Sequence, residues 1–304
     1  MPDSGVGQLK TCRRSRRAPR AGLLAAGFTL LLGTLVAITP AAVAQTTPPP
    51  LPICIVDGPE QISLPGDGVS AGAALPNGSG FFQVTSDGMI ALFGSAGCYG
   101  SPILVSHAPI VGMAVDAATG GYWLAAKDGT VFNYDAPNLG SLGGTHLNAP
   151  IVGIAADPAS GGFWLAAADG GVFNFGAPFL GSLGGNHLSS PIVGLAADQA
   201  TGGFWLAAAN GGVFAFNAPN LGSLTGTHLN APIVGIASPA TGGYWLAAAD
   251  GGVFSFGAPF RGSAVGLHFL GGVIAIVPAS VSDGYWLVTF YGETLGFDVP
   301  AFPT

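Results

Sequence analysis

The sequence predicts an all-β chain built from one repeated unit. Copies of the phrase Gly-Gly-aromatic-Trp-Leu recur along the chain, and a degenerate form opens the series. Successive aromatic anchors are 41, 41, 41, 40 and 41 residues apart, at Phe82, Trp123, Trp164, Trp205, Trp245 and Trp286. A period of this length with several short strands per unit is typical of a β-propeller. We therefore expect a single six-bladed β-propeller, preceded by a signal peptide.

Each unit carries the signals of a four-stranded antiparallel blade. In the copy at 148–188 an apolar run is followed by turn residues, a second apolar run and the hairpin signal Asp169-Gly170. A third strand follows, and after Ala177-Pro178 a fourth is expected. The four strands are predicted over 149–156, 163–167, 172–175 and 180–183. Small residues in the first run suit an innermost strand, where blades crowd the axis.

The repeats account for nearly the whole chain after its first 56 residues. The predicted units are 57–106, 107–147, 148–188, 189–229, 230–270 and 271–304. The last unit has room for only a stub of a fourth strand. The segment 53–56 is a spare strand, and we expect it to complete the last blade and close the ring, since closure removes exposed edges.

The N-terminus has the form of an export signal over 1–44. Six Lys and Arg residues precede an apolar run at 21–38, and Ala42-Val43-Ala44 gives a small-x-small cleavage site. We expect export by the general secretory route, because the residues after the twin arginines fit a twin-arginine motif poorly. An uncleaved membrane anchor formed by 21–44 is the alternative. Residues 45–52 are predicted to be a Pro-stiffened spacer leading to the domain at 53–304.

Charge excludes one class of partner. Cleavage would leave Lys127 and Arg261 against fourteen acidic residues, a net charge of −12 with His neutral. Nucleic-acid binding needs a basic surface, so it is not expected. The negative charge also disfavours binding by charge alone to an anionic membrane or an anionic wall polymer. We expect a secreted or cell-surface protein.

Two cysteines remain after removal of Cys12 with the signal. Cys54 and Cys98 form an even pair in an oxidising compartment, which favours a disulfide between the N-terminal segment and the first repeat. Two buried free thiols are the alternative.

Histidines and turn residues recur at fixed positions in the repeat. Each His lies in a link between blades, and the turn residue of the next hairpin follows 21 to 23 residues later. The pairs are His107 with Asp128, His146 with Asp169, His187 with Asn210, His228 with Asp250, and His268 with Tyr291. We interpret the first four as structural hydrogen bonds within a blade, resembling the His–Asp link of WD-repeat propellers. A ring of imidazoles that binds a metal or an anion is the alternative, although separate blades place these ligands too far apart.

The tryptophans are expected in the core, because each lies mid-strand between an aromatic residue and Leu. The alternative, a stacking platform for sugars, would require exposed rings. Ligand contacts are more plausible at one variable position beside a loop proline, occupied by Asn138, Phe179, Asn220 and Phe260. Plain surface variation would explain the same pattern.

No catalytic motif is found: the chain lacks a Gly-x-Ser-x-Gly elbow, His-Glu-x-x-His, a phosphate loop and a calcium loop. No metal or cofactor is expected. Singletons that depart from the repeat are Lys127, Arg261, Tyr291 and Glu293, and a lone surface charge is usually only solvated.

The unit at 242–259 resembles a Trp- and Gly-rich repeat of secreted proteins from actinobacteria and related high-GC bacteria. The resemblance covers residues 80–297 and implies a secreted propeller, without an established ligand or catalytic residue. We expect a non-enzymatic module that binds a surface glycan, a wall polymer or a protein. An extracellular hydrolase or lyase acting at the channel mouth, and a self-associating surface coat, are the alternatives.

Overall fold

A computed structural model describes residues 54–56, 68–103, 105–106 and 108–299. The predicted signal peptide, its cleavage site and the Pro-rich spacer lie outside these residues, as does His107. Every regular element in the described part is a β-strand. No helix in the described ranges is long and apolar enough to cross a membrane.

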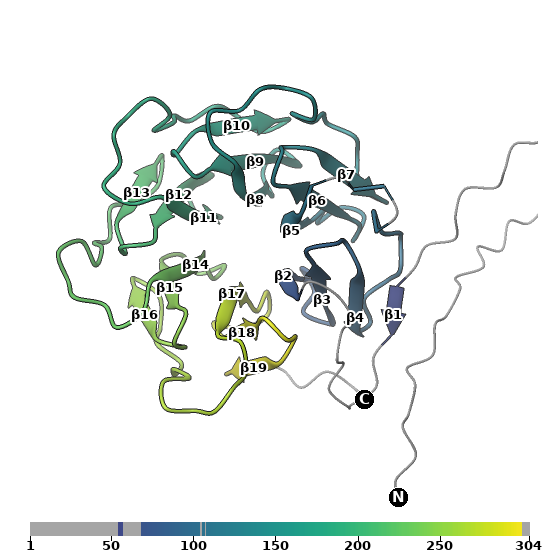
Figure 1. Ribbon diagram of the computed structural model, residues 1–304. Coiled ribbons are helices and arrows are strands. Elements are labelled where there is room, and N and C mark those ends of the chain that lie inside the picture. Colours follow the sequence, from purple (N-terminus) through teal and green to yellow (C-terminus); the bar gives the residue numbers. More distant parts are fainter. Residues whose placement is uncertain (1–53, 57–67, 104, 107, 300–304) are drawn as a thin grey trace, which may run out of the picture.

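The strands form six sheets arranged around one axis like the blades of a propeller (Figure 1), and each blade is an antiparallel meander of an inner, a middle and an outer strand. The inner strands are β2 (Val69–Ala74), β5 (Ile110–Val115), β8 (Ile151–Asp157), β11 (Ile192–Asp198), β14 (Ile233–Ala237) and β17 (Val273–Pro278). The middle strands are β3 (Gly80–Thr85), β6 (Tyr122–Ala126), β9 (Gly162–Ala167), β12 (Gly203–Ala208), β15 (Tyr244–Ala248) and β18 (Tyr285–Thr289). The outer strands are β4 (Ile90–Gly94), β7 (Val131–Tyr134), β10 (Val172–Phe175), β13 (Val213–Phe216), β16 (Val253–Phe256) and β19 (Thr294–Phe297).

Blades are numbered 1 to 6 in chain order, and the ring has two faces. The inner-turn face carries the turns that join inner to middle strands. The outer-turn face carries the hairpins that join middle to outer strands, together with the ends of the links that lead into the next blade. The outer strand of each blade ends at the inner-turn face. The link that follows therefore starts at this face and crosses the rim to the outer-turn face.

The predicted fourth strand of each blade is wrong. In blade 2 the corresponding segment makes one backbone hydrogen bond to the strands and hairpins of its blade, from Leu142 N to Gly129 O (2.9 Å), and a second within the link, from Thr145 N to Leu142 O (2.8 Å). Gly140 has a φ of 120°, and a Cβ there would lie 2.9 Å from the ring of Phe175 in blade 3. The segment therefore leaves its own sheet and packs against an aromatic side chain of the next blade. Gly181 and Gly262 take the same position against Phe216 and Phe297.

The prediction that the N-terminal strand at 53–56 completes the last blade is also wrong. β1 (Cys54–Val56) pairs with β4 of blade 1, in parallel register, rather than with the last blade. A disulfide joins Cys54 to Cys98 (S–S 2.14 Å, Cα–Cα 5.9 Å), which confirms the predicted pair and ties β1 to the link that follows β4.

The ring closes through the same contact that joins every pair of blades. The first residue of each inner strand donates its amide to a hairpin carbonyl of the preceding blade, at 2.8–3.0 Å. The pairs are Val69 with Phe290, Ile110 with Ser86, Ile151 with Lys127, Ile192 with Ala168, Ile233 with Ala209, and Val273 with Ala249. Because the first of these joins blade 1 to blade 6, closure needs no strand shared between the chain ends.

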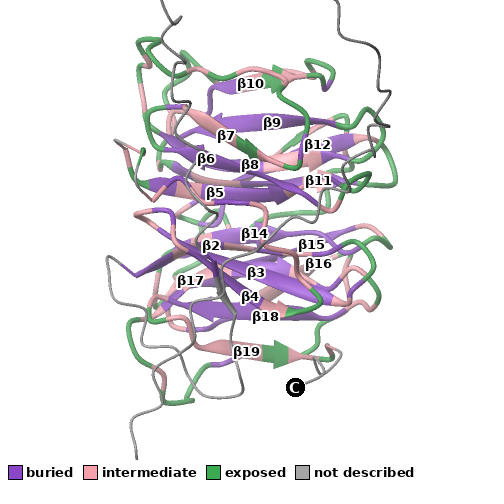
Figure 2. Cartoon of the chain, turned by 90° about the vertical axis from the view of Figure 1, so that its right-hand side faces the viewer, coloured by how far each residue is buried: buried purple, intermediate pink, exposed green. Residues whose placement is uncertain are grey.

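The core lies between blades and is aromatic. The middle strands are buried over their whole length, whereas exposure rises in the outer strands and loops (Figure 2). Each middle-strand tryptophan packs against an aromatic ring of the next blade, as Trp164 does against Phe204 with centroids 5.2 Å apart. All five tryptophans are buried, which confirms the predicted core position and excludes an exposed sugar platform at these rings.

Candidate functional site

The variable loop position is held by the buried tryptophans. Trp164 donates its indole Nε1–H to the carbonyl oxygen of Pro178 (2.8 Å), and Phe179 is the next residue. Trp123, Trp205 and Trp245 make the same bond at 2.8 Å, to Pro137, Pro219 and Pro259. A buried N–H needs an acceptor, so this bond fixes the loop. The residue after each proline is thereby presented at the rim of the inner-turn face.

The four predicted contact residues are all exposed there. The phenyl rings of Phe179 and Phe260 are 62% and 59% exposed. Asn138 and Asn220 each accept a hydrogen bond at Oδ1 from the amide two residues on, Gly140 and Gly222, both at 3.2 Å. Their amide NH2 groups make no hydrogen bond to another described residue, so they are available as donors. The position thus alternates between a bare aromatic ring and an amide donor.

These four residues occupy four successive blades, 2 to 5, so Phe179 and Phe260 lie two blades apart. The structure brings them onto one face, and none of them lines the channel cavity or the outer-turn groove described below. An arrangement of separated, equivalent positions suits an extended ligand that runs along the rim better than a compact one.

A cavity of about 440 Å³ opens at the channel mouth on the inner-turn face. All six inner strands contribute to its wall, which consists mainly of small and apolar residues. Two carboxylates, Asp116 and Asp157, are part of this lining. The exposed polar side chain of Gln199 lies at the mouth as well.

The channel aspartates are engaged by their own turns. Asp157 accepts hydrogen bonds at Oδ2 from Ser160 Oγ (2.6 Å) and at Oδ1 from Ala159 N (3.1 Å). Asp116 and Asp198 are bonded in the same way by the residues two and three positions on. These aspartates are not among the site residues predicted from the sequence. Their burial is a tertiary property, and the repeated Asp-x-x-Ser/Thr-Gly spacing was the available signal.

The predicted His–turn hydrogen bonds are absent from the described part of the chain. His146, His187, His228 and His268 are exposed there, and none bonds to a turn residue. The turn side chains instead cap their own hairpins: Asp169 Oδ1 accepts from Gly171 N at 3.0 Å. The remaining caps are Asp128 with Thr130, Asn210 with Gly212, and Asp250 with Gly252. His146 and Asp169 do line one groove of about 270 Å³ on the outer-turn face.

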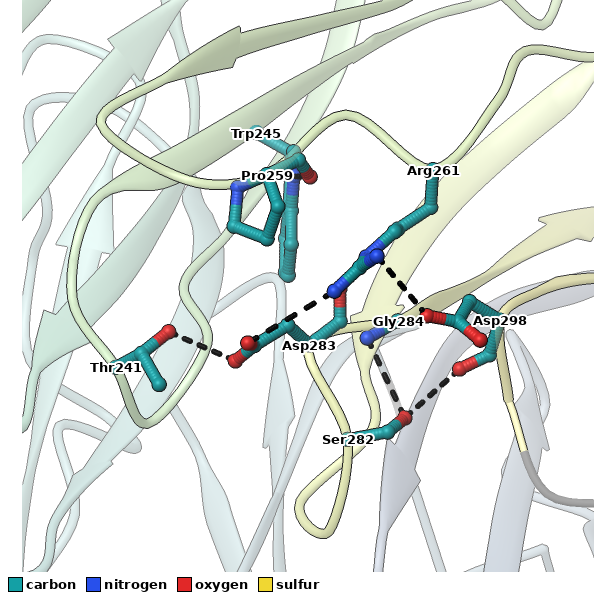
Figure 3. A network of polar contacts seen from close by, with 8 residues as sticks. All are labelled: Thr241, Trp245, Pro259, Arg261, Ser282, Asp283, Gly284 and Asp298. Carbon is teal, nitrogen blue, oxygen red and sulfur yellow. Dashed lines mark hydrogen bonds and ion pairs between the residues drawn. The ribbon is translucent and has the colours of Figure 1, made fainter.

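Arg261 lies in a network of polar contacts (Figure 3). Its guanidinium donates Nε–H to the Asp283 carbonyl (3.1 Å) and lies 3.2 Å from Asp298 Oδ2. Thr241 of blade 5 donates to Asp283 Oδ1 at 2.7 Å, so the network joins blades 5 and 6. Other links carry Leu139, Leu180 and Leu221 at the Arg261 position. Arg261, which departs from the Leu of the repeat, therefore makes a structural contact between blades 5 and 6.

The middle-strand tyrosines are neutral donors in the core. Tyr122 donates to the Gly100 carbonyl at 2.6 Å, and Tyr244 and Tyr285 donate to Gly222 and Gly262. Burial raises the pKa of all three phenols, that of Tyr244 to about 12, because the charged form would lose its hydration. These hydroxyls bind the link of the preceding blade and take no part in a surface site.

Within the described ranges no three His, Cys, Asp or Glu side chains are grouped so that they could hold a metal ion. The carboxylates that repeat from blade to blade are bonded within their own turns, as Asp157 and Asp169 are, whereas the repeated histidines of the described ranges are exposed.

Comparison with models of known protein families and with curated proteins finds no match. Among solved structures, a structural genomics protein of unknown function from Bacteroides thetaiotaomicron is similar, with a TM-score of 0.48 and 14% identity. The similarity covers 78% of this chain and 71% of that chain.

Proposed function

We propose that this chain is an exported, non-enzymatic binding module that recognises an extended extracellular glycan on its inner-turn face. The observation that carries the proposal is the pair of exposed phenyl rings, Phe179 and Phe260, at equivalent positions on one face. Aromatic faces pack on the apolar faces of sugar rings, and an exposed ring held by a rigid loop loses little entropy on binding.

The neighbouring blades supply hydrogen-bond donors for the same ligand. Asn138 and Asn220 use only their side-chain oxygens in the turn, to accept from Gly140 and Gly222. Their amide NH2 groups can therefore donate hydrogen bonds to sugar hydroxyls. A neutral glycan fits the charge of the chain, because the exported form would carry a strong negative charge that repels anionic polymers.

Export is supported by the N-terminal signal pattern and by the disulfide between Cys54 and Cys98. Disulfides persist in oxidising compartments and are rare in the cytosol. Catalysis at the channel mouth receives less support, because both carboxylate oxygens of Asp116 and of Asp157 already accept hydrogen bonds from their own turns.

The test is depletion of purified 45–304 from solution by insoluble wall and polysaccharide fractions. Saturable depletion by one neutral polymer is expected. Phe179→Asn and Phe260→Asn place in blades 3 and 5 the residue that blades 2 and 4 already carry, so the loop conformation should be kept. Each should weaken binding by roughly tenfold, as loss of an aromatic contact does.

The matched control is Gln199→Ala, altered at an exposed residue on the same face but at the channel mouth. Binding unchanged by both Phe substitutions, or lost equally in the control, would contradict the rim site. Absence of depletion by every fraction would contradict glycan recognition itself.

A further inference from the structure

Four large apolar side chains are exposed on the outer-turn face where the link from blade 5 enters blade 6. We call Val265, Leu267, Leu270 and Tyr291 the apolar patch; they are 60%, 55%, 73% and 59% exposed. Three lie on the link that enters blade 6, and Tyr291 is in the hairpin of that blade. Single exposed apolar residues are common, but a contiguous group marks an interaction surface.

The patch exists only where the repeat changes. At the Leu270 position the other links of this type carry Asn148, Ser189 and Asn230. The Leu267 position is Thr or Asn in those links, the Val265 position is Gly or Thr, and the Tyr291 position is Asp or Asn in the hairpins of blades 1 to 5. Equivalent backbone therefore accepts polar residues at all four sites, so the fold does not require apolar ones here.

Local packing holds the link against the hairpin. A Cβ on Gly271 would lie 2.8 Å from the ring of Tyr291, so the residue that follows Leu270 packs directly against this hairpin. Phe290 N donates to Gly272 O (3.1 Å), and the Phe290 ring meets that of Tyr291 edge-on at 5.2 Å. The patch is thus a preformed surface on a fixed backbone.

Acidic residues flank the patch on both sides. The link passes over the blade 5 hairpin through the bond from Ala264 N to Gly251 O (2.9 Å), which puts Asp250 beside it. On the other side, Glu293 lies two residues after Tyr291. The Lys and Arg residues of the described chain are elsewhere: Lys127 is in blade 2, and Arg261 bonds Asp283 and Asp298.

We propose that the apolar patch binds a segment of a partner protein that presents large apolar side chains flanked by Lys or Arg. The apolar side chains of the partner pack against Val265, Leu267 and Leu270, and its basic side chains lie near the carboxylates of Asp250 and Glu293. A second copy of this chain carries the same acidic flanks and a net negative charge, so like charges would face each other. This inference does not rest on the glycan site, which lies on the opposite face.

The test uses the protein purified from an expressing host and a labelled synthetic peptide with a Leu-Phe-Leu core flanked by lysines. A peptide with the same core flanked by glutamates is its partner control. Fluorescence anisotropy should show saturable binding of the lysine peptide, at least roughly tenfold tighter than that of the glutamate peptide.

Two sets of variants separate the apolar and the charged contributions. Val265→Gly, Leu267→Thr, Leu270→Asn and Tyr291→Asn restore residues found at the same positions of other blades, so folding should be kept. Combined, they should abolish binding of the lysine peptide. Asp250→Asn keeps the hairpin cap, as Asn210 does in blade 4, and with Glu293→Gln should remove most of the preference for lysine.

Three outcomes would overturn the proposal. Equal binding of both peptides would remove the role of charge. A dimer that dissociates in the patch variant, seen by sedimentation, would make the occupant a second copy. Patch-dependent binding to phosphatidylcholine vesicles without peptide binding would make it a lipid surface. The Phe179→Asn variant is the control, since it alters the opposite face only.

Discussion

The backbone amide of Val69, which begins blade 1, donates a 2.8 Å hydrogen bond to the carbonyl oxygen of Phe290 in blade 6. This is the same bond that joins every other pair of neighbouring blades. The first and last blades therefore meet as any two repeats do, although they are the most divergent in sequence. Side chains join the two blades as well: Phe81 packs against Trp286 with ring centroids 5.4 Å apart, and Gln83 bonds to the blade 6 hairpin.

Substitution of Gln83 should open the ring junction. Gln83 is buried, and its Nε2 donates to Gly292 O (3.0 Å) and Thr294 Oγ1 (2.7 Å) across the junction. Gln83→Ala removes both bonds, so the free energy of unfolding should fall by about 1–3 kcal/mol. Denaturant unfolding measures this. Gln199→Ala, at an exposed site, is the control, and an equal small change in both variants would contradict a role of Gln83 in closure.

Loss of the disulfide should release β1. The strand is only three residues long and pairs with one edge of β4. The double variant Cys54→Ser, Cys98→Ser should lower the free energy of unfolding by about 2–4 kcal/mol. It should also expose the N-terminal segment to proteases at concentrations that spare the native protein. Reductant should mimic this in the native protein and have no effect on the variant; reductant sensitivity of the variant would point to another cause.

Alkaline pH should destabilise the ring through its buried phenols. The pKa of Tyr244 is raised to about 12 by burial, whereas an unfolded tyrosine titrates near 10. The folded state binds the phenol proton more tightly than the unfolded state does. The contribution of the protonated phenol to the free energy of unfolding is therefore full below pH 10 and is lost as the pH rises to about 12.

Tyr244→Phe should reduce this loss, because Phe163 and Phe204 occupy the same position in blades 3 and 4. At neutral pH it should cost only about 1 kcal/mol, through loss of the bond to Gly222 O. Denaturant unfolding between pH 8 and pH 12 measures both effects. Tyr291→Phe, at an exposed ring, is the matched control. A stability curve with the same slope in the Tyr244 variant and the native protein would refute this assignment.

Replacement of Arg261 should have a small effect on stability. Its ion pair with Asp298 and its contact with Asp283 are partly exposed, and such pairs contribute less than about 1 kcal/mol. Arg261→Leu installs the residue of three other links, so the loss should be within this limit and should disappear in high salt. Unfolding in low and high salt measures it. A large, salt-independent loss would instead assign a packing role to the Arg261 stem.

Much of the fold could be predicted because its signals are local. The period of the Gly-aromatic-Trp-Leu phrase placed the middle strands, and the Asp-Gly hairpins placed the strands on either side of them. Burial of Trp164 and its equivalents followed from their position inside apolar runs. The Cys54–Cys98 pair followed from the number of cysteines and from the export signal expected in the sequence.

The errors arise where a segment has a choice of neighbours. The run after Pro178 is apolar enough for a strand, but Gly181 is needed against the ring of Phe216, a contact with the next blade that spacing does not reveal. His146 and Asp169 line one groove, yet the Asp169 carboxylate accepts its hydrogen bond from the backbone N–H of Gly171, which is only two residues away in the same hairpin. The exposed group at Val265, Leu267 and Leu270 was missed, although comparison of the links position by position contains the signal.

The chain alone therefore specifies six aromatic, Gly-rich sheets and their turns, because strand periodicity and turn chemistry act over a few residues. Tertiary packing decides which strand edge β1 covers, how the ring closes between Val69 and Phe290, and which apolar residues remain at the surface. These outcomes depend on competition between partners far apart in sequence, and that competition is settled by which groups can be buried and hydrogen-bonded together.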